Sequence, residues 1–133
     1  MSVLSDDVRA FLAEPHFAVL ATVGAQGLPH QSVMWYLLEG DEIVFNTKAG
    51  RAKERYLRDD PRASLLIGGE YRYVRVIGRV REIRDPGIAH DDSRRLAIRY
   101  TGALAAAKSM ERFSLEERIT YRLPIDRVYA YGL

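Results

Sequence analysis

Residues 17–47 read FAVLATVGAQGLPHQSVMWYLLEGDEIVFNT, three runs rich in β-forming residues that are separated by two turns. Strands are expected over Phe17–Val23, Leu28–Leu38 and Glu42–Thr47, because each run is apolar or β-branched and has turn residues at its ends. Gly24–Gly27 and Glu39–Asp41 supply those turn residues. The segment therefore predicts an antiparallel sheet of hairpin-linked strands.

Outward from this segment, helical and β patterns alternate. A capping Ser followed by two acids opens a helix over Ser5–Glu14. Further helices are expected over Lys48–Arg58 and from Ala89 to Lys108, where Gly102 weakens the middle. Further strands are expected over Arg62–Ile67, Tyr71–Ile83, Arg118–Leu123 and Arg127–Tyr131. This order predicts a mainly β fold, a small closed or partly closed barrel with flanking helices.

The bulk composition limits the class of protein. With 133 residues, 47% hydrophobic and 29% charged, one globular domain over residues 1–133 is expected. No apolar run approaches the roughly 18 residues that span a bilayer, so a cytoplasmic protein without a membrane partner is the expectation. The chain has no Cys, and its three His lie far apart without acids at ligand spacing, so no metal site is expected.

A basic turn follows the third strand. Asn46 and Thr47 end that strand, and Lys48, Arg51 and Lys53 surround a Gly-containing turn that enters a helix. Free backbone N–H groups and the positive end of a helix dipole meet these cations there, which favours a phosphate-binding site. A solvated basic face of a helix is the alternative interpretation.

Several stretches resemble the pyridoxamine-phosphate-oxidase-like split-barrel flavoproteins, especially their deazaflavin-dependent branch. The resemblance covers nearly the whole chain, and its most specific part is the Arg-x-Lys pair at residues 51–53 followed by Leu-Arg-x-Asp-Pro-Arg at residues 57–62. The strand at residues 17–22, the segment 27–36 and the closing segment 121–129 also match. Tyr56 departs from the Asn usual in that helix.

The resemblance implies an FMN-binding split barrel, a Greek-key-like antiparallel barrel of six or seven strands. It also implies a homodimer with two cofactor sites in the groove between subunits. The family's phosphate-binding positions correspond to Arg51 and Lys53, and its strand along the ring system corresponds to Ser32–Trp35. The candidate cofactor-binding residues are Ser32, Val33, Met34, Trp35, Asn46, Thr47, Lys48, Arg51, Ala52 and Lys53.

The function expected from this resemblance is an oxidoreductase that uses the deazaflavin coenzyme F420 to transfer hydride to a small organic acceptor. An FMN-binding oxidoreductase of the same fold is the first alternative, and a non-catalytic flavin or deazaflavin binder is the second. Flavins and deazaflavins carry the redox chemistry themselves, so the chain needs no catalytic acid and none is assigned.

Three features leave alternatives open. Trp35 fits stacking beside a cofactor ring, or packing in the core or at a dimer interface. Arg72, Arg75, Arg79 and Arg81 with Tyr71 and Tyr73 fit a nucleic-acid surface or pairing with acids across strands, and with a net charge of only +2 no nucleic-acid partner is expected. Arg94, Arg95 and Arg99 fit a solvated helix face or the acidic tail of a polyglutamylated cofactor.

Overall fold

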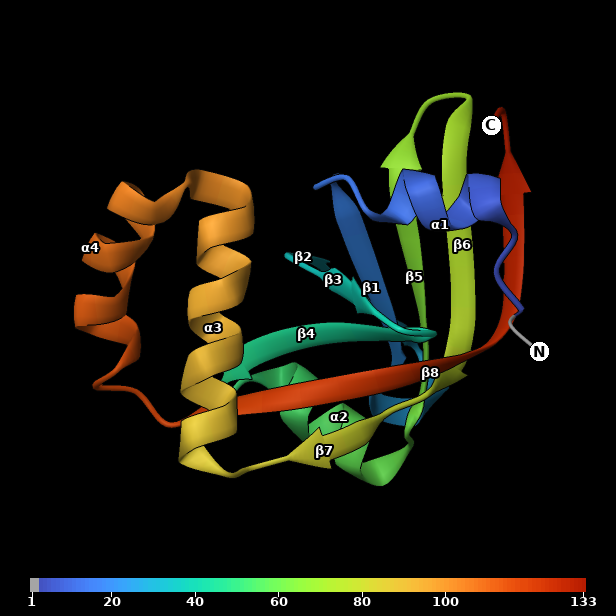
Figure 1. Ribbon diagram of the computed structural model, residues 1–133. Helices are drawn as coiled ribbons and strands as arrows, with labels where there is room; N and C mark the ends of the chain where they lie inside the picture. The colour runs from blue at the N-terminus through green and yellow to red at the C-terminus, as the bar shows by residue number, and fades with distance from the viewer. Residues whose placement is uncertain (1–2) are drawn as a thin grey trace.

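One strongly curved antiparallel sheet forms the centre of the computed structural model, which describes residues 3–133 (Figure 1). Its strands follow the order β2-β1-β5-β6-β8-β4-β3, and β7 pairs with β8 beside this path. The strands are β1 (Ala18–Val23), β2 (Pro29–Met34), β3 (Leu37–Glu39), β4 (Glu42–Lys48), β5 (Arg62–Gly69), β6 (Arg72–Arg79), β7 (Arg81–Ile83) and β8 (Arg118–Tyr131). The helices are α1 (Asp6–Leu12), the short η1 (Ala25–Gly27), α2 (Ala52–Asp59), α3 (Pro86–Thr101) and α4 (Ala103–Phe113).

The longest strand, β8, joins the two parts of the sheet. Residues 118–124 pair with β4, whereas the segment from Ile125 to Tyr131 pairs with β6. The strands approach so closely at this change of partner that a Cβ on Gly78 would lie 2.2 Å from the carbonyl oxygen of Pro124. Position 78 therefore requires Gly, since any side chain there would push β6 and β8 apart.

The main core lies inside the curved sheet. Leu20, Phe45, Leu65, Val76 and Leu123 are buried there, each from a different strand. The first helix lies across β5 and β6 (Figure 1) and adds further apolar side chains to this core. As predicted, the Ser5 hydroxyl caps that helix by accepting a hydrogen bond from the Val8 N–H at 3.3 Å.

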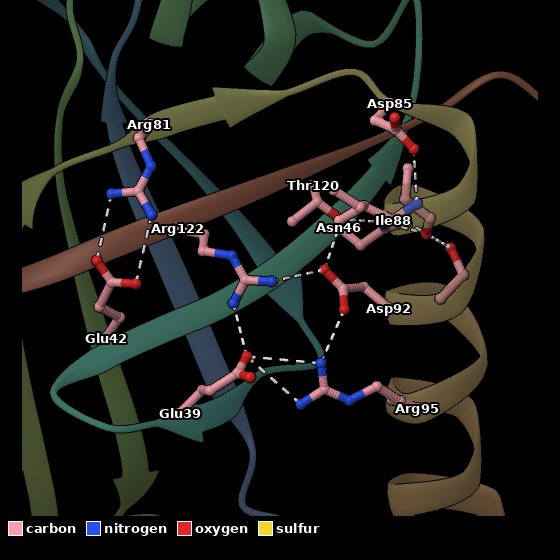
Figure 2. Close-up of polar contacts among 12 residues, drawn as sticks. Glu39, Glu42, Asn46, Arg81, Asp85, Ile88, Asp92, Arg95, Thr120 and Arg122 are labelled. Carbon is pink, nitrogen blue, oxygen red and sulfur yellow. Dashed lines mark hydrogen bonds and ion pairs between the residues drawn. The ribbon is translucent and has the colours of Figure 1, made fainter.

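The helices α3 and α4 lie outside the sheet, beside the end of β4 and the start of β8 (Figure 1). Asp85 caps α3, because its carboxylate accepts a hydrogen bond from the Ile88 N–H at 3.1 Å (Figure 2). The predicted single helix ending at Lys108 is wrong. Gly102 adopts φ +89°, which ends α3 and starts the separate helix α4.

The mainly β architecture with flanking helices is confirmed, but several strand boundaries differ from the prediction. The expected strand Leu28–Leu38 is two strands, because the chain leaves the sheet at Tyr36, whose buried hydroxyl donates to the carbonyl oxygens of Leu12 and Glu14. The expected strand Tyr71–Ile83 is also two strands, because the Val80 N–H donates to the Pro61 carbonyl oxygen.

One expected break between strands is absent, and one helix begins later than expected. The two strands expected around Pro124 form one continuous strand, since Pro124 lies where β8 changes partner and its missing N–H is not needed. Because two expected strands are each divided and two others are joined, the sheet within residues 3–133 has eight strands rather than six or seven. The second helix begins at Ala52 rather than Lys48, because Lys48 still pairs with Arg118 across β4 and β8.

Candidate anion-binding site

A cleft of about 260 Å³ opens between β2, the end of β4 and the three helices α2, α3 and α4. Five of the side chains that line it are cationic, namely Lys48, Arg51, Lys53, Arg112 and Arg118. The other lining residues are Val33, Met34, Trp35, Asn46, Thr47, Ser93, Leu96 and Phe113. The cleft therefore combines a cationic wall with an apolar one.

The structure brings most of the predicted site residues together. Eight of the ten line this cleft, and the exceptions are Ser32 and Ala52. Ser32 lies on β2 with its hydroxyl buried and without a hydrogen-bond partner in the described part of the chain. Ala52 is the first residue of α2, where a backbone N–H rather than the methyl side chain is available to a ligand.

Five cleft residues were missing from the prediction: Ser93, Leu96, Arg112, Phe113 and Arg118. They come from α3, α4 and the first residue of β8, which are distant in sequence from the basic turn. Only the register of β4 against β8, which places Arg118 opposite Lys48, brings the last of them to the cleft. Arg112 and Arg118 stand among Glu111, Glu116 and Glu117 in the sequence, so no basic cluster marks them there.

Lys53 is the most unusual of these cations. Its side chain is buried, with 7% of the residue exposed, and its ammonium group donates to the Met34 sulfur at 3.0 Å. No carboxylate in residues 3–133 forms an ion pair with it. Burial lowers the pKa of Lys53, and the nearby charges of Arg51 and Arg118 lower it further. The fold thus holds a desolvated cation that lacks a counter-charge.

The turn before α2 is fixed by a neighbouring acid. Gly50 adopts φ +93°, and its N–H donates to the Glu54 carboxylate at 2.6 Å. Arg58 and Arg84 also donate to that carboxylate, the former at 2.7 Å. These contacts lower the pKa of Glu54, with the Gly50 hydrogen bond as the largest cause. Arg51 is the N-cap residue of the helix, so its guanidinium lies at the positive end of the helix dipole.

Asn46 has a structural role that differs from direct cofactor binding. Its amide nitrogen donates to the Ala89 carbonyl oxygen at 3.0 Å and to the Thr120 hydroxyl at 2.9 Å (Figure 2). Its amide oxygen accepts from Ser93 at 2.8 Å and from the Arg118 Nε at 2.9 Å. The buried amide is therefore fully used in joining α3 to the sheet and in orienting Arg118.

A buried acid supports the same junction. Asp92, which is 2% exposed, accepts a hydrogen bond from Thr120 at 3.0 Å and pairs with Arg95 and Arg122. Glu39 bridges the two guanidiniums (Figure 2). Arg95 thus has partners within the chain, as does Arg94 with Asp91. Arg99 donates to three backbone carbonyl oxygens at the C-terminal end of α1, those of residues 12–14.

The aromatic residues serve mainly in packing. Trp35 stacks on Tyr100 with ring centroids 5.5 Å apart, and it also packs between two small buried clusters that involve α3 and α4. In the arginine series of residues 72–81, Arg81 of β7 pairs with Glu42 of β4 at 3.3 Å (Figure 2), whereas Arg75 lies over the Tyr129 ring of β8. Pairing with an acid across strands, one of the two interpretations of this series, is thus found at Arg81.

Within residues 3–133, no group of three or more His, Cys, Asp or Glu side chains is arranged to hold a metal ion. In the same part of the chain, every helix is too short or too polar to cross a membrane.

The fold and the sequence both match known proteins. The profile of the pyridoxamine 5'-phosphate oxidase family matches residues 4–129. A pyridoxine/pyridoxamine 5'-phosphate oxidase of Cupriavidus pinatubonensis is 40% identical over 120 residues, which are 84% of this chain and 55% of that protein. The chain therefore spans about half the length of this curated relative, and only 36% and 37% of two others with the same name.

Solved structures share the fold over almost the whole chain. A conserved hypothetical protein of Mycobacterium tuberculosis superposes with a TM-score of 0.82 at 29% identity, covering 98% of this chain and 86% of the other. A structure described as an F420 reductase has a TM-score of 0.77 at 22% identity, covering 95% and 98%. The predicted split-barrel fold is thus confirmed, and the chain belongs to the pyridoxamine 5'-phosphate oxidase family.

Proposed function

We propose that this chain binds a phosphate-bearing flavin-type cofactor in the cationic cleft and acts with it as an oxidoreductase. The observation that carries the proposal is the buried ammonium group of Lys53, which has a thioether as its contact and two further cations nearby. A buried charge without a counter-charge is costly to the folded state. A phosphate in the cleft would supply the missing charge to Lys53 and Arg51 together.

The backbone favours the same ligand. The first turn of α2 presents N–H groups without intrahelical acceptors beside the two cations. Glu54, the acid in that turn, is already held by Gly50, Arg58 and Arg84, so its charge is compensated away from Lys53. An incoming phosphate therefore meets donors rather than a competing carboxylate.

The apolar wall suits the ring system of such a cofactor. Val33 is 65% exposed on β2, and Leu96 of α3 and Phe113 of α4 line the same cleft. When bound, the cofactor would supply the hydride chemistry, while these residues would exclude water and hold the ring. The acceptor is proposed to be a small organic molecule, and no side chain is assigned a catalytic role.

Among the cofactors, we favour F420 over FMN. The support is the resemblance of residues 51–62 to the deazaflavin-dependent branch and the fold shared with an F420 reductase. The relatives named as pyridoxine/pyridoxamine 5'-phosphate oxidases keep FMN as the alternative. A non-catalytic binder is the third possibility, distinguished by tight binding of the reduced cofactor without oxidation by any of a panel of acceptors.

The functional unit is proposed to be a homodimer. Val33 at the rim of the cleft and Leu66 and Tyr129 on the sheet are exposed apolar side chains, which a second copy of the chain would cover. Sedimentation of the purified protein tests this proposal, and the mass of a single chain at micromolar concentration would contradict it.

Titration with F420, FMN and riboflavin tests the cofactor proposal. The parent should bind F420 or FMN and should bind riboflavin, which lacks the phosphate, much more weakly. Lys53→Met and Arg51→Ala should each weaken the phosphate-bearing cofactor about 10-fold or more, because charge-assisted hydrogen bonds contribute about 1.5 to 3 kcal/mol. Arg55→Ala is the matched control, because Arg55 is an exposed cation of the same helix outside the cleft lining.

Two outcomes would contradict the proposal. One is binding of riboflavin as tight as that of F420 or FMN, whichever phosphate-bearing cofactor binds, which would mean that the phosphate is not recognised. The other is parent-like binding of the phosphate-bearing cofactor by both cleft variants.

A further inference from the structure

The cationic wall extends beyond the pair at the start of α2. Arg118 has only 11% of its side chain exposed, yet its guanidinium reaches the cleft. It is the first residue of β8, opposite Lys48 of β4, whereas Arg112 lies in the last turn of α4. Burial lowers the pKa of Arg118, and the nearby charges of Arg51 and Arg112 lower it further. The cations of the cleft thus come from α2, from the paired ends of β4 and β8, and from α4.

Phe113 holds the second pair of cations. The Arg118 guanidinium carbon lies 4.6 Å from the centroid of its ring, and that of Arg112 lies 5.0 Å from the same centroid. Such contacts fix the position of a guanidinium without using its N–H groups. In Arg118, Nη1 donates to Glu116 at 2.9 Å, and Nη2 has no hydrogen bond within residues 3–133. The Arg118 Nε also donates a hydrogen bond to the buried Asn46 amide oxygen, which helps to hold the guanidinium at the cleft.

The charges of the wall exceed those of one phosphate. Five cations line the cleft, and Glu116 is the acid paired with two of them, with Arg118 at 2.9 Å and Lys48 at 3.8 Å. Within residues 3–133, neither Arg51 nor Arg112 forms an ion pair with a carboxylate. A phosphate monoester carries about 1.5 to 2 negative charges at pH 7, so a single one would leave part of the wall uncompensated.

We infer that Arg112 and Arg118, which both contact the Phe113 ring, form a second anion subsite for a carboxylate or phosphate located beyond the first phosphate on the same ligand. The inference rests on the proposed function for the first phosphate. It favours a cofactor with several anionic groups, such as F420 with its glutamate tail, over FMN. It also places that tail near Arg112 rather than near Arg94, Arg95 and Arg99, whose side chains have partners within the chain.

Equilibrium binding of F420 with and without its glutamate tail tests the inference. The parent should bind the tailed form about 10-fold more tightly, and Arg112→Ala should lose most of this preference while binding the tail-free form within about twofold of the parent. Arg94→Ala is the control, because Arg94 is an exposed cation of α3 paired with Asp91. Equal binding of the two forms by the parent, or equal weakening of both by Arg112→Ala, would overturn the subsite.

A second arm separates this inference from the cofactor proposal. If neither F420 nor FMN binds, the proposed function fails, but two linked phosphates still probe both subsites. Pyrophosphate should then raise the melting temperature of the parent more than inorganic phosphate at equal concentration, and Arg112→Ala should remove that difference. If pyrophosphate is no better than phosphate for the parent, the second subsite is overturned as well. A fall in stability of Arg112→Ala without ligand would report only its place at the C-terminal end of α4.

Discussion

Lys53 and Glu54 are consecutive residues of α2, and both are buried, yet the fold compensates their charges in opposite ways. Glu54 accepts hydrogen bonds from the Gly50 N–H and from two guanidiniums, those of Arg58 and Arg84. Lys53 contacts a Met sulfur and faces two more cations. The carboxylate belongs to a network completed within the chain, whereas the ammonium group lies in a site that only a ligand can complete.

The charges around Glu54 stabilise the fold, whereas those around Lys53 are available to bind a ligand. Around Glu54, the partner Arg84 also pairs with Glu82 and Glu117, so each cation there has an acid. Around Lys53, the cations outnumber the acids. Stability should therefore depend on Glu54, and ligand binding should depend on Lys53.

The largest expected effect is on the Glu54 side. Glu54→Gln should lower the free energy of unfolding by about 3 kcal/mol, because two guanidiniums and the Gly50 N–H lose a charged acceptor in a largely buried position. Urea denaturation at pH 7 measures the difference. Glu42→Gln is the control, since among residues 3–133 Glu42 pairs only with the exposed Arg81, across 3.3 Å, and its loss should change stability by less than about 1 kcal/mol. Equal effects of the two variants would remove the distinction.

At the neighbouring residue Lys53, a smaller effect of opposite sign on the free energy of unfolding is expected. Lys53→Met should raise the free energy of unfolding by about 1 kcal/mol in the absence of ligand, because it replaces an uncompensated buried charge with an apolar side chain of similar length. The same urea experiment measures it. A loss of stability as large as that of Glu54→Gln would mean that Lys53 is compensated within the fold, and the comparison would fail.

Patterns of neighbouring residues predicted α2, which carries Lys53 and Glu54, and several other elements of the fold. The cap at Ser5, the strand that ends at Thr47 and Lys48, and the helix stopped by Pro61 depend on neighbouring residues, and the sequence predicts them to within a few positions. The breaks at Tyr36 and Val80 were missed because they depend on contacts with Leu12 and Pro61, far away along the chain.

The residues of the cleft also fall into a group that neighbouring sequence predicted and a group that it did not. The phosphate-binding turn is contiguous in sequence, so Lys48, Arg51 and Lys53 were predicted together. Arg118 and Arg112 reach the cleft only through the β4–β8 register and the turn from α3 into α4 at Gly102. Composition also gave no signal that Lys53 would lack a counter-charge while Glu54 would have three donors, because that depends on which face of α2 each residue occupies.

The smallest expected effect is the pH dependence of the Glu54 contribution. The Gly50 hydrogen bond, followed by Arg84 and Arg58, holds the pKa of Glu54 below its ordinary value. A carboxylate with a lowered folded-state pKa stabilises the protein fully above its unfolded value of about 4.3, and this contribution is lost as the pH falls toward the folded-state pKa. The stability difference between the parent and Glu54→Gln should therefore be constant from pH 7 to about pH 5 and should narrow below that, whereas Arg55→Ala should follow the parent throughout. Urea denaturation between pH 3 and pH 7 measures both differences. A gap that stays unchanged down to pH 3 would show that hydrogen bonding to Glu54 does not depend on its charge, and the contrast with Lys53 would then be one of packing rather than of electrostatics.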